Sequence, residues 1–383
     1  MTEHLERILP ELKRLRRELH QFPEVSENEF KTAERIKGYL TKFCSGTVRT
    51  IARTGVLVVF ESGVNGKSVL LRADTDALPI AETNTFDHRS VSEGVSHKCG
   101  HDGHTVMMLG VAHLLSLNPP KTGRVVLLFQ PAEENGWGAA AVLDDREFRT
   151  WHFDYVFALH NLPGFEESEI VIREQYFNAN VKSMIADLHG KTAHAAEPEH
   201  GHNPALAIAE ILQECERLTY NVPQSDEFFL ITPIYITMGE LAHGISAGEG
   251  SVHLTIRSWD LELFDRLCGE LQDFIGQRCL EHQLSHTISW TQIFYANKNH
   301  SEANEIVRKA ARSNGFILHE MTHPFKWGED FGLFTQKFKG TMFGLGSGKN
   351  TPALHNPDYD FPDEITSTGI KQFLRIVEEV MGD

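Results

Sequence analysis

The stretch RVVLLFQPAEENGWG, Arg124–Gly138, joins an unbroken apolar run of strand length to two glutamates and a glycine-rich turn. A continuous apolar run bounded by turn residues is typical of a strand buried on both faces of a sheet. Glu133 and Glu134 follow this run directly, so we expect both carboxylates to be buried. Two buried neighbouring carboxylates repel each other, and a bound cation offsets that cost. The stretch therefore predicts a cation site at a strand end, with one glutamate available for proton transfer.

Strand and helix patterns alternate on both sides of this stretch, a rhythm typical of an α/β sheet with helices on both faces. The middle of the chain instead shows strands separated by long amphipathic helices, which indicates a smaller α+β sandwich inserted into the first domain. We place the first domain at 1–179 and 294–383, and the insert at 180–293. The expected helices cover 3–21, 27–43, a segment from near 103, 203–218, 261–282, 302–314 and 363–381, and the expected strands cover 56–61, 68–73, 124–130, 155–159, 181–190, 251–260, 286–294 and 341–345.

Composition excludes several classes of function. The chain has 383 residues and a net charge of −17, and both nucleic acid and anionic membranes prefer basic partners. No apolar run approaches the roughly 20 residues that span a bilayer. The charged, helical N-terminal segment does not resemble a signal peptide. Five scattered cysteines without CxxC spacing favour a reducing cytoplasm over a disulfide framework.

Four of the predicted strands are followed by polar residues. Sites in open α/β sheets form outside the carboxyl ends of the strands. We therefore expect these ends to converge on one crevice, together with the segment from Cys99 to His104. The residues that follow the four strands are Asp74 and Asp76, Glu133 and Glu134, His160, and, after a short loop, His355.

The segment SHKCGHDGHTVMMLG, Ser96–Gly110, permits three interpretations: a zinc knuckle, a nucleophilic cysteine with its base, or part of a catalytic metal site. The spacing of Cys99 and His101 does not fit a structural zinc knuckle. A helix start near Gly103 lowers a thiol pKa, which favours a thiolate as nucleophile or as ligand. The glutamates and histidines at the other strand ends favour the metal ligand. Thiolate and imidazole suit Zn, Mn, Ni or Co better than Mg or Ca, and His104 is then left with a supporting role.

Seven motifs occur in order across nearly the whole chain: RADTDALP, HKCGHDGHT, FQPAEENGWGA, FALHN, GKTAHAAEP, EDFGLF and LHNPDYDF. Together they resemble the N-acyl-amino-acid amidohydrolases of the aminoacylase/carboxypeptidase-type dinuclear metallopeptidases. That branch includes hippurate hydrolases, auxin-conjugate hydrolases and N-acetyldiaminopimelate deacetylases. The resemblance implies an aminopeptidase-like α/β catalytic domain with a mostly parallel central sheet, interrupted by a lid and dimerisation domain. It also implies a homodimer with two divalent metal ions that cleaves the amide bond of small N-acyl amino acids.

The resemblance assigns a role to each candidate residue. Glu133 looks like the general base that activates water, and Asp76 matches a carboxylate that orients a site histidine. His194 matches a histidine that reaches the scissile carbonyl oxygen, typically in the neighbouring subunit's site. Arg257 is in the place of an arginine that can bind a substrate carboxylate. The implied metal ligands are Cys99, which can bridge two metals, His101, Glu134, His160 and His355.

One residue and one segment depart from the pattern of the family. Lys98 precedes Cys99 where relatives commonly have a small residue. The segment AHGISAG, Ala242–Gly248, replaces an Asn-Val-Ile-Pro segment and leaves the specificity for acyl group and amino acid open. Three alternative functions also remain: a dipeptidase or aminopeptidase on the same metal centre, a cysteine-dependent hydrolase that uses Cys99, and a binding protein that kept the fold.

Overall fold

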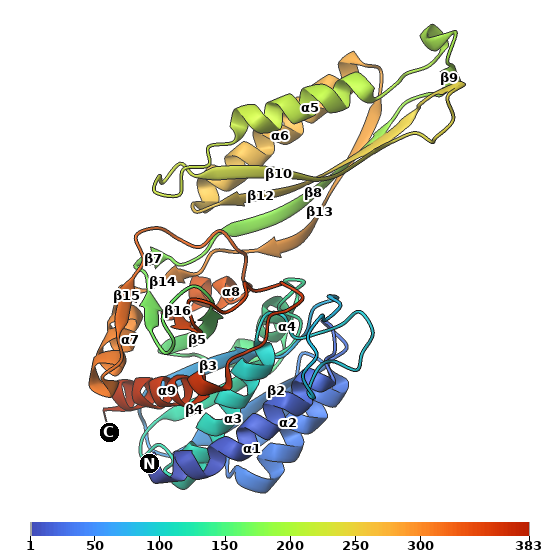
Figure 1. Cartoon of the computed structure of the whole chain (residues 1–383). Helices are drawn as coiled ribbons and strands as arrows, with labels where there is room; N and C mark the ends of the chain where they lie inside the picture. Colours follow the sequence, from blue (N-terminus) through green and yellow to red (C-terminus); the bar gives the residue numbers. More distant parts are fainter. Residues whose placement is uncertain (1, 383) are drawn as a thin grey trace. The chain divides into compact units, whose positions relative to one another are not determined.

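The computed structural model describes residues 2–382, and the chain divides into two compact units (Figure 1). The first comprises Met1–Phe177, Asn297–Thr322 and Glu329–Asp383, and the second comprises Asn178–Ala296 and His323–Gly328. The second unit thus contains the segment expected as an insert, together with the short segment His323–Gly328, which the sequence had assigned to the first domain.

The first unit is built on an eight-stranded sheet with the strand order β1-β2-β4-β3-β5-β16-β6-β15. At its centre, β4 (Arg124–Gln130), β3 (Ser68–Asp74), β5 (Tyr155–Leu162) and β16 (Gly340–Gly346) run parallel. These strands are buried almost throughout, which indicates that both faces of the sheet are covered. The remaining strands of this unit are β1 (Thr47–Ile51), β2 (Gly55–Glu61), β6 (Ile170–Ile172) and β15 (Leu318–Glu320), and the separate pair β7 (Gln175–Tyr176) and β14 (Lys298–Asn299).

One long helix, α3 (His101–Leu117), forms the centre of the helical layer. It is apolar nearly all round, which is typical of a helix surrounded by protein. It contacts α1 (Thr2–Gln21), α2 (Phe30–Phe43) and α9 (Thr366–Met381), which lie on the same side of the sheet in Figure 1. The other helical elements of this unit are α4 (Gly138–Asp144), η1 (Phe148–Thr150), α7 (Ser301–Asn314), α8 (Gly332–Lys337) and η3 (Asp363–Ile365).

The second unit is a four-stranded antiparallel sheet, ordered β10-β12-β8-β13, with two helices on one side (Figure 1). Burial alternates along β12, as expected when one face of a sheet packs on helices. None of the helices within residues 2–382 combines the length and apolar character needed to cross a membrane. The elements are β8 (Asn180–His189), β9 (Ala193–His194), η2 (Pro198–His200), α5 (Ala205–Leu218), β10 (Phe229–Met238), β11 (Ile245–Ser246), β12 (Glu249–Ser258), α6 (Leu261–Glu281) and β13 (Ser285–Phe294).

Three predicted elements of the first unit have an end displaced by three residues, and the others differ by two residues or fewer. Helix α2 begins at Phe30 rather than at residue 27, because Glu27 has a φ of +67°, which is incompatible with a right-handed helix. Strand β5 continues to Leu162, so His160 lies inside the strand and not at its end. The closing helix predicted over 363–381 starts with the short turn η3 before α9.

Strand β10 was not predicted. Its sequence contains Pro233, which cannot donate a hydrogen bond to a neighbouring strand. The structure accommodates this proline because β10 is an edge strand and its register shifts between Pro233 and Tyr235.

Candidate metal centre

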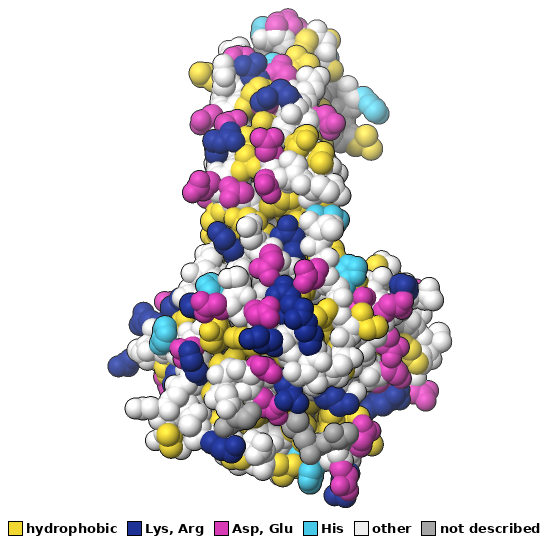
Figure 2. All heavy atoms as spheres, turned by 90° about the vertical axis from the view of Figure 1, so that its left-hand side faces the viewer, with side chains coloured by type: hydrophobic (Ala, Val, Ile, Leu, Met, Phe, Trp, Pro, Cys, Tyr) yellow, Lys and Arg dark blue, Asp and Glu magenta, His cyan; other side chains and the backbone are white. Residues whose placement is uncertain are grey.

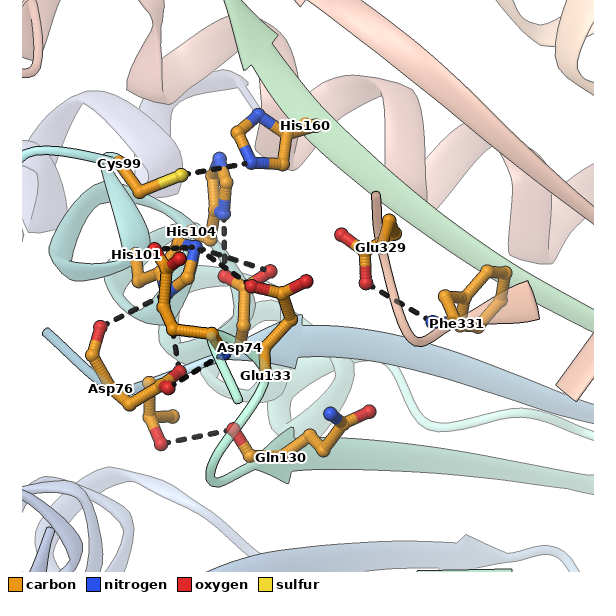
Figure 3. A network of polar contacts seen from close by, with 12 residues as sticks. Asp74, Asp76, Cys99, His101, His104, Gln130, Glu133, His160, Glu329 and Phe331 are labelled. Atoms are coloured by element: carbon orange, nitrogen blue, oxygen red, sulfur yellow. Dashed lines mark hydrogen bonds and ion pairs between the residues drawn. The ribbon is translucent and has the colours of Figure 1, made fainter. Parts of the chain in front are cut away.

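The four parallel strands at the centre of the sheet present their carboxyl ends at one edge. Helix α3 begins beside them, so the CGHDGH segment joins the same cluster. Figure 3 shows Cys99, His101, Glu133 and His160 gathered there. The structure thus brings together every candidate residue of the first unit: Asp76, Cys99, His101, Glu133, Glu134, His160 and His355.

Two groups of potential ligand atoms each lie within 4.8 Å of one another. The first group is Cys99, Glu134 and His355, and the second is His101, Glu133 and Glu134. Glu134 belongs to both, because its Oε1 is 3.8 Å from Nε2 of His101 and its Oε2 is 3.8 Å from Nε2 of His355. The two groups therefore meet at Glu134, an arrangement suited to two neighbouring cations.

Cys99 enters the cluster from a tight turn at the start of α3. The next residue, Gly100, has a φ of +91°, a conformation that glycine adopts without strain. A Cβ atom there would lie 2.4 Å from Oδ1 of Asn161. The Cys99 Sγ lies 3.4 Å from Nε2 of His160, whose Nδ1 donates to the carbonyl oxygen of Asn161 at 2.9 Å. The turn and β5 thus direct the thiol and the imidazole toward each other (Figure 3).

In a third group, Asp74, His101, His104 and His160, the spacing also suits a metal, but Asp74 and His104 are bonded to each other. Nδ1 of His104 donates to Oδ1 of Asp74 at 2.6 Å, and its Nε2 accepts from the N–H of Asn161 at 3.1 Å. Both ring nitrogens are therefore used. His104 supports the cluster and has no lone pair left to offer a metal.

Unpartnered polar atoms in the cluster fit a bound cation. Nδ1 of His101 donates to the carbonyl oxygen of Asp76 at 2.9 Å, which leaves Nε2 to face the glutamates. That Nε2 and Oε1 of Glu134 are buried without a hydrogen-bond partner in the described part of the chain. A buried polar atom left without a partner costs about 1–3 kcal/mol, which a coordinated cation would offset. Imidazole, thiolate and carboxylate together suit a divalent transition metal.

The pKa shifts in the cluster also favour a bound cation. Burial raises the pKa of the Cys99 thiol well above its usual value, and Glu134 raises it further. Burial likewise raises the pKa of Glu133. Burial by itself would lower the pKa of His101, but the carboxylates beside it, Asp74 first, raise that pKa to about 10. The cluster therefore holds an excess of negative groups, and a bound cation stabilises their charged forms.

Asp76 connects the two sides of the cluster. Its Oδ1 lies 3.3 Å from Nδ1 of His101. Its Oδ2 accepts hydrogen bonds from Oγ of Ser26 at 2.7 Å and from the main-chain N–H of Glu134 at 3.0 Å. Asp76 thus fixes the ring orientation of His101 and the backbone that carries Glu134, which is how groups behind metal ligands act.

The structure also reveals a support that sequence reasoning missed. Arg72, on β3, is fully buried, and its guanidinium donates to Asp74 at 2.6 Å and to Glu329 and Asp330 at 2.9 Å each. Glu329 and Asp330 also lie near Glu133. Arg72 therefore compensates carboxylates next to the cluster. The motif EDFGLF contained both acids, but an arginine inside an apolar strand was the only local signal of their partner.

His194 and Arg257 belong to the second unit. His194 lies on β9, where its Nδ1 accepts a hydrogen bond from the Ala196 N–H at 3.0 Å, so a neutral ring carries its proton on Nε2. Residue Ile245 of the atypical segment 242–248 pairs with His194 across β9 and β11. Nη1 of Arg257 donates to the carbonyl oxygen of Lys326 at 2.5 Å. Burial lowers the pKa of Arg257.

Comparison with known proteins places this geometry in context. The family model described as Peptidase family M20/M25/M40 matches residues 70–379. An N-acetyldiaminopimelate deacetylase from Anoxybacillus flavithermus is 29% identical over 371 residues, which cover 95% of this chain and 96% of that protein. The resemblance drawn from the seven motifs is thus confirmed.

Solved structures confirm the predicted fold class. A dinuclear metal-binding peptidase of the M20 family from Bacillus subtilis superposes with a TM-score of 0.83 at 23% identity, covering 98% of this chain and 99% of that one. A protein from methicillin-resistant Staphylococcus aureus that is assigned as an aminohydrolase superposes with a TM-score of 0.87. The two chains are 23% identical, and the match covers 98% of each. At these identities the structures establish the fold, and the family model establishes the kinship. The chain is a hydrolase that belongs to Peptidase family M20/M25/M40.

Proposed function

We propose that this chain is a metal-dependent amidohydrolase that cleaves small N-acyl amino acids into an amino acid and a carboxylic acid. The observation that carries this proposal is the division of labour between two adjacent glutamates. Glu134 lies 3.8 Å from both His101 and His355, whereas Glu133 lies 4.0 Å from His101 and belongs to no group with His355. The name of the Anoxybacillus flavithermus relative, N-acetyldiaminopimelate deacetylase, supports an acyl-amide substrate.

The residues that would hold two metal ions come from three strand ends and one helix start. When bound, divalent ions at such a site activate water and polarise the amide carbonyl. The donor set suits Zn, Mn, Ni or Co. We assign as ligands Cys99, His101, Glu134, His160 and His355, and a thiolate such as that of Cys99 would be able to serve both ions.

Glu133 acts as the general base in this proposal. Its buried carboxylate lies 4.0 Å from Nε2 of His101, close to the ligands. From there it takes a proton from the attacking water and delivers it to the leaving amine. Asp76 keeps His101 in one orientation throughout.

Two residues of the second unit have side chains suited to contacts with the substrate. The Nε2–H of His194 is a donor suited to the negative oxygen that develops on the scissile carbonyl. Arg257 is suited to a substrate carboxylate, because within the described residues it bonds only to the carbonyl of Lys326 and pairs with no acid. The atypical segment at β11 lies beside His194, so we expect it to influence which acyl group or amino acid is accepted.

We also propose a homodimer formed through the second unit. Strand β10 is an edge strand, and an exposed edge offers unpaired backbone groups to another chain. Its apolar side chains at Ile234, Tyr235 and Ile236 are 62%, 55% and 41% exposed. Consecutive exposed apolar residues on an open edge are typical of an interaction surface. A second copy of the chain would cover them and bring its own His194 to the neighbouring site.

A mixed dimer tests this arrangement. A heterodimer of Glu133→Gln and His194→Ala chains, isolated through two different tags after coexpression, should recover about half of wild-type turnover, because one site then holds both Glu133 and His194. Each variant alone should be nearly inactive. A heterodimer as inactive as its parents would place His194 in its own subunit's site.

Surface charge and cysteine content fit a small-molecule enzyme of the cytoplasm. On the face shown in Figure 2, Lys and Arg side chains are interspersed with Asp and Glu, without the basic stripe that nucleic acid requires. The five cysteines are free thiols in the structure. These observations support a cytoplasmic location and a small acyl amino acid as partner.

Cysteine catalysis is disfavoured by the surroundings of Cys99. Its side chain is 7% exposed, and burial together with nearby carboxylates raises its pKa. A reactive nucleophile needs the opposite, a thiolate stabilised at neutral pH. The thiol of Cys99 is therefore poorly suited to attack a substrate.

A substrate panel with metal control tests the function. Purified protein should hydrolyse N-acetyl or N-benzoyl amino acids, lose more than about 90% of turnover after exhaustive chelation, and regain it with Mn²⁺ or Zn²⁺. Metal content is measured on the same samples. Preference for free dipeptides would establish the peptidase alternative, and activity that survives chelation would establish a cysteine hydrolase.

A further inference from the structure

Lys98 is buried directly before Cys99 and makes three contacts that join separate parts of the first unit. Its Nζ donates to Oε1 of Glu82 at 2.5 Å and to the carbonyl oxygen of Tyr359 at 2.7 Å. Its own carbonyl oxygen accepts a hydrogen bond from the main-chain N–H of His355 at 2.8 Å. The side chain is fully buried. One residue therefore binds both ends of the segment 355–359.

We propose that Lys98 is a positioning residue for the metal centre, holding the loop that carries His355 against the turn that carries Cys99. The inference rests on the metal site proposed above. Its physical basis is that Cys99 and His355 lie in one ligand group but come from loops far apart in the sequence. Groups that fix ligands from behind typically change metal affinity by about 10- to 100-fold.

The conformation and exposure of His355 indicate that its loop depends on contacts with other parts of the chain. His355 has a φ of +65°, an uncommon conformation for a residue with a side chain, and its side chain is 53% exposed. Packing alone therefore restrains it weakly. The Tyr359 end is anchored on its other side by Asn161, whose Nδ2 donates to the Tyr359 hydroxyl at 2.6 Å. Lys98 and Asn161 hold Tyr359 from both ends, and Asn161 is the neighbour of His160.

The Glu82 carboxylate, which accepts a hydrogen bond from the Lys98 ammonium, is held in place by other residues. Glu82 also accepts from Nε2 of His20 at 3.0 Å and from the main-chain N–H of Ser90 at 2.6 Å. Burial opposes ionisation of Glu82, but its bonds to His20 and Lys98 keep its pKa well below the usual range. The ammonium is thus locked in place between Glu82 and Tyr359. A neutral side chain of the same length would fill the space without binding the loop.

Two features of Lys98 must be separated by experiment: compensation of Glu82 and attachment of the loop. Lys98→Met removes both, and its buried uncompensated carboxylate could impair folding. The double variant Lys98→Met/Glu82→Gln removes the charge problem and the bond from Nζ to the Tyr359 carbonyl, while the main-chain bond between residue 98 and His355 stays. Glu82→Gln alone is the matched control, because Lys98 keeps its bond to the Tyr359 carbonyl.

Titration of the metal-free full-length protein with Mn²⁺ alone, followed by calorimetry, measures the effect without any substrate. Wild type and Glu82→Gln should bind two ions. Lys98→Met/Glu82→Gln should bind the first ion with the same affinity as Glu82→Gln. Its affinity for the second ion should be at least about tenfold lower, and His355→Ala should show the same loss. Adding His355→Ala to the double variant should cause a smaller loss than adding it to Glu82→Gln, because both changes act on the same ligand.

Equal binding of both ions by the double variant and by Glu82→Gln overturns the positioning role. Fully additive losses with His355→Ala overturn it as well, since Lys98 would then act elsewhere. Wild type that binds fewer than two ions, or His355→Ala that retains both, instead overturns the proposed ligand set. The failure of the metal site and the failure of the Lys98 role therefore give different results.

Discussion

Glu133→Gln is expected to lower kcat for amide hydrolysis by about 10²- to 10⁴-fold while the metal content stays at its wild-type value. Glutamine has the size of glutamate but cannot accept the proton of the attacking water. Glu133 lies 4.0 Å from Nε2 of His101 in a buried position, so its replacement leaves the ligand atoms of Glu134 in place. Steady-state kinetics and metal analysis of the same preparation measure both quantities.

Glu134→Gln is the matched control for this experiment. Its carboxylate faces His101 with one oxygen and His355 with the other, so this variant should lose metal as well as turnover. A small change in KM for Glu133→Gln would show that substrate binding is intact. If Glu133→Gln loses its metal and Glu134→Gln keeps it, the two glutamates have exchanged roles.

The polar ends of the central strands could be predicted because each follows a local pattern. Residues 69–71 of β3 and 125–129 of β4 form unbroken apolar runs, so each strand can be recognised without knowledge of its partners. Glu133 and Glu134 then follow at once. His355 is different, since a loop separates it from β16; the strand end indicated its neighbourhood, and the resemblance to a family gave it the role of a ligand.

Contacts that depend on long-range pairing could not be predicted. Arg72 lies in an apolar strand, and its partners Glu329 and Asp330 lie 257 and 258 residues later in the chain. Lys98 was visible as a departure from the family pattern, but its partner Glu82 lies in a segment without periodicity. Periodicity reports which face of an element is buried, and it contains no information on which charges meet inside.

Arg72→Met is expected to lower the free energy of unfolding by about 3–5 kcal/mol. The guanidinium is fully buried and bonds to three carboxylates, those of Asp74, Glu329 and Asp330. Methionine occupies much of the same space but leaves these acids without a cation. Urea unfolding of the chelator-treated protein at pH 8 measures the loss free of any stabilisation by bound metal.

This loss of stability should grow with pH. Burial raises the pKa of Asp330, and Arg72 opposes that rise. Without Arg72 the pKa rises further, so the folded variant retains protons that the unfolded chain has already released. A folded state that binds more protons than the unfolded state loses stability as pH increases. In the wild type the pKa of Asp330 is already about 8, so both proteins keep this proton below that pH. The deficit at pH 10 should therefore exceed the deficit at pH 8 by at least about 1 kcal/mol.

Arg35→Met provides the comparison, because Arg35 pairs with Glu18 at 3.0 Å where the acid is 43% exposed. Loss of such a solvated pair should cost less than about 1 kcal/mol and vary little with pH. Similar losses for Arg72→Met and Arg35→Met at both pH values would mean that water or protons already neutralise the acids around Arg72. A large, pH-dependent loss confined to Arg72→Met would instead show that one buried guanidinium balances the carboxylates that adjoin the metal centre.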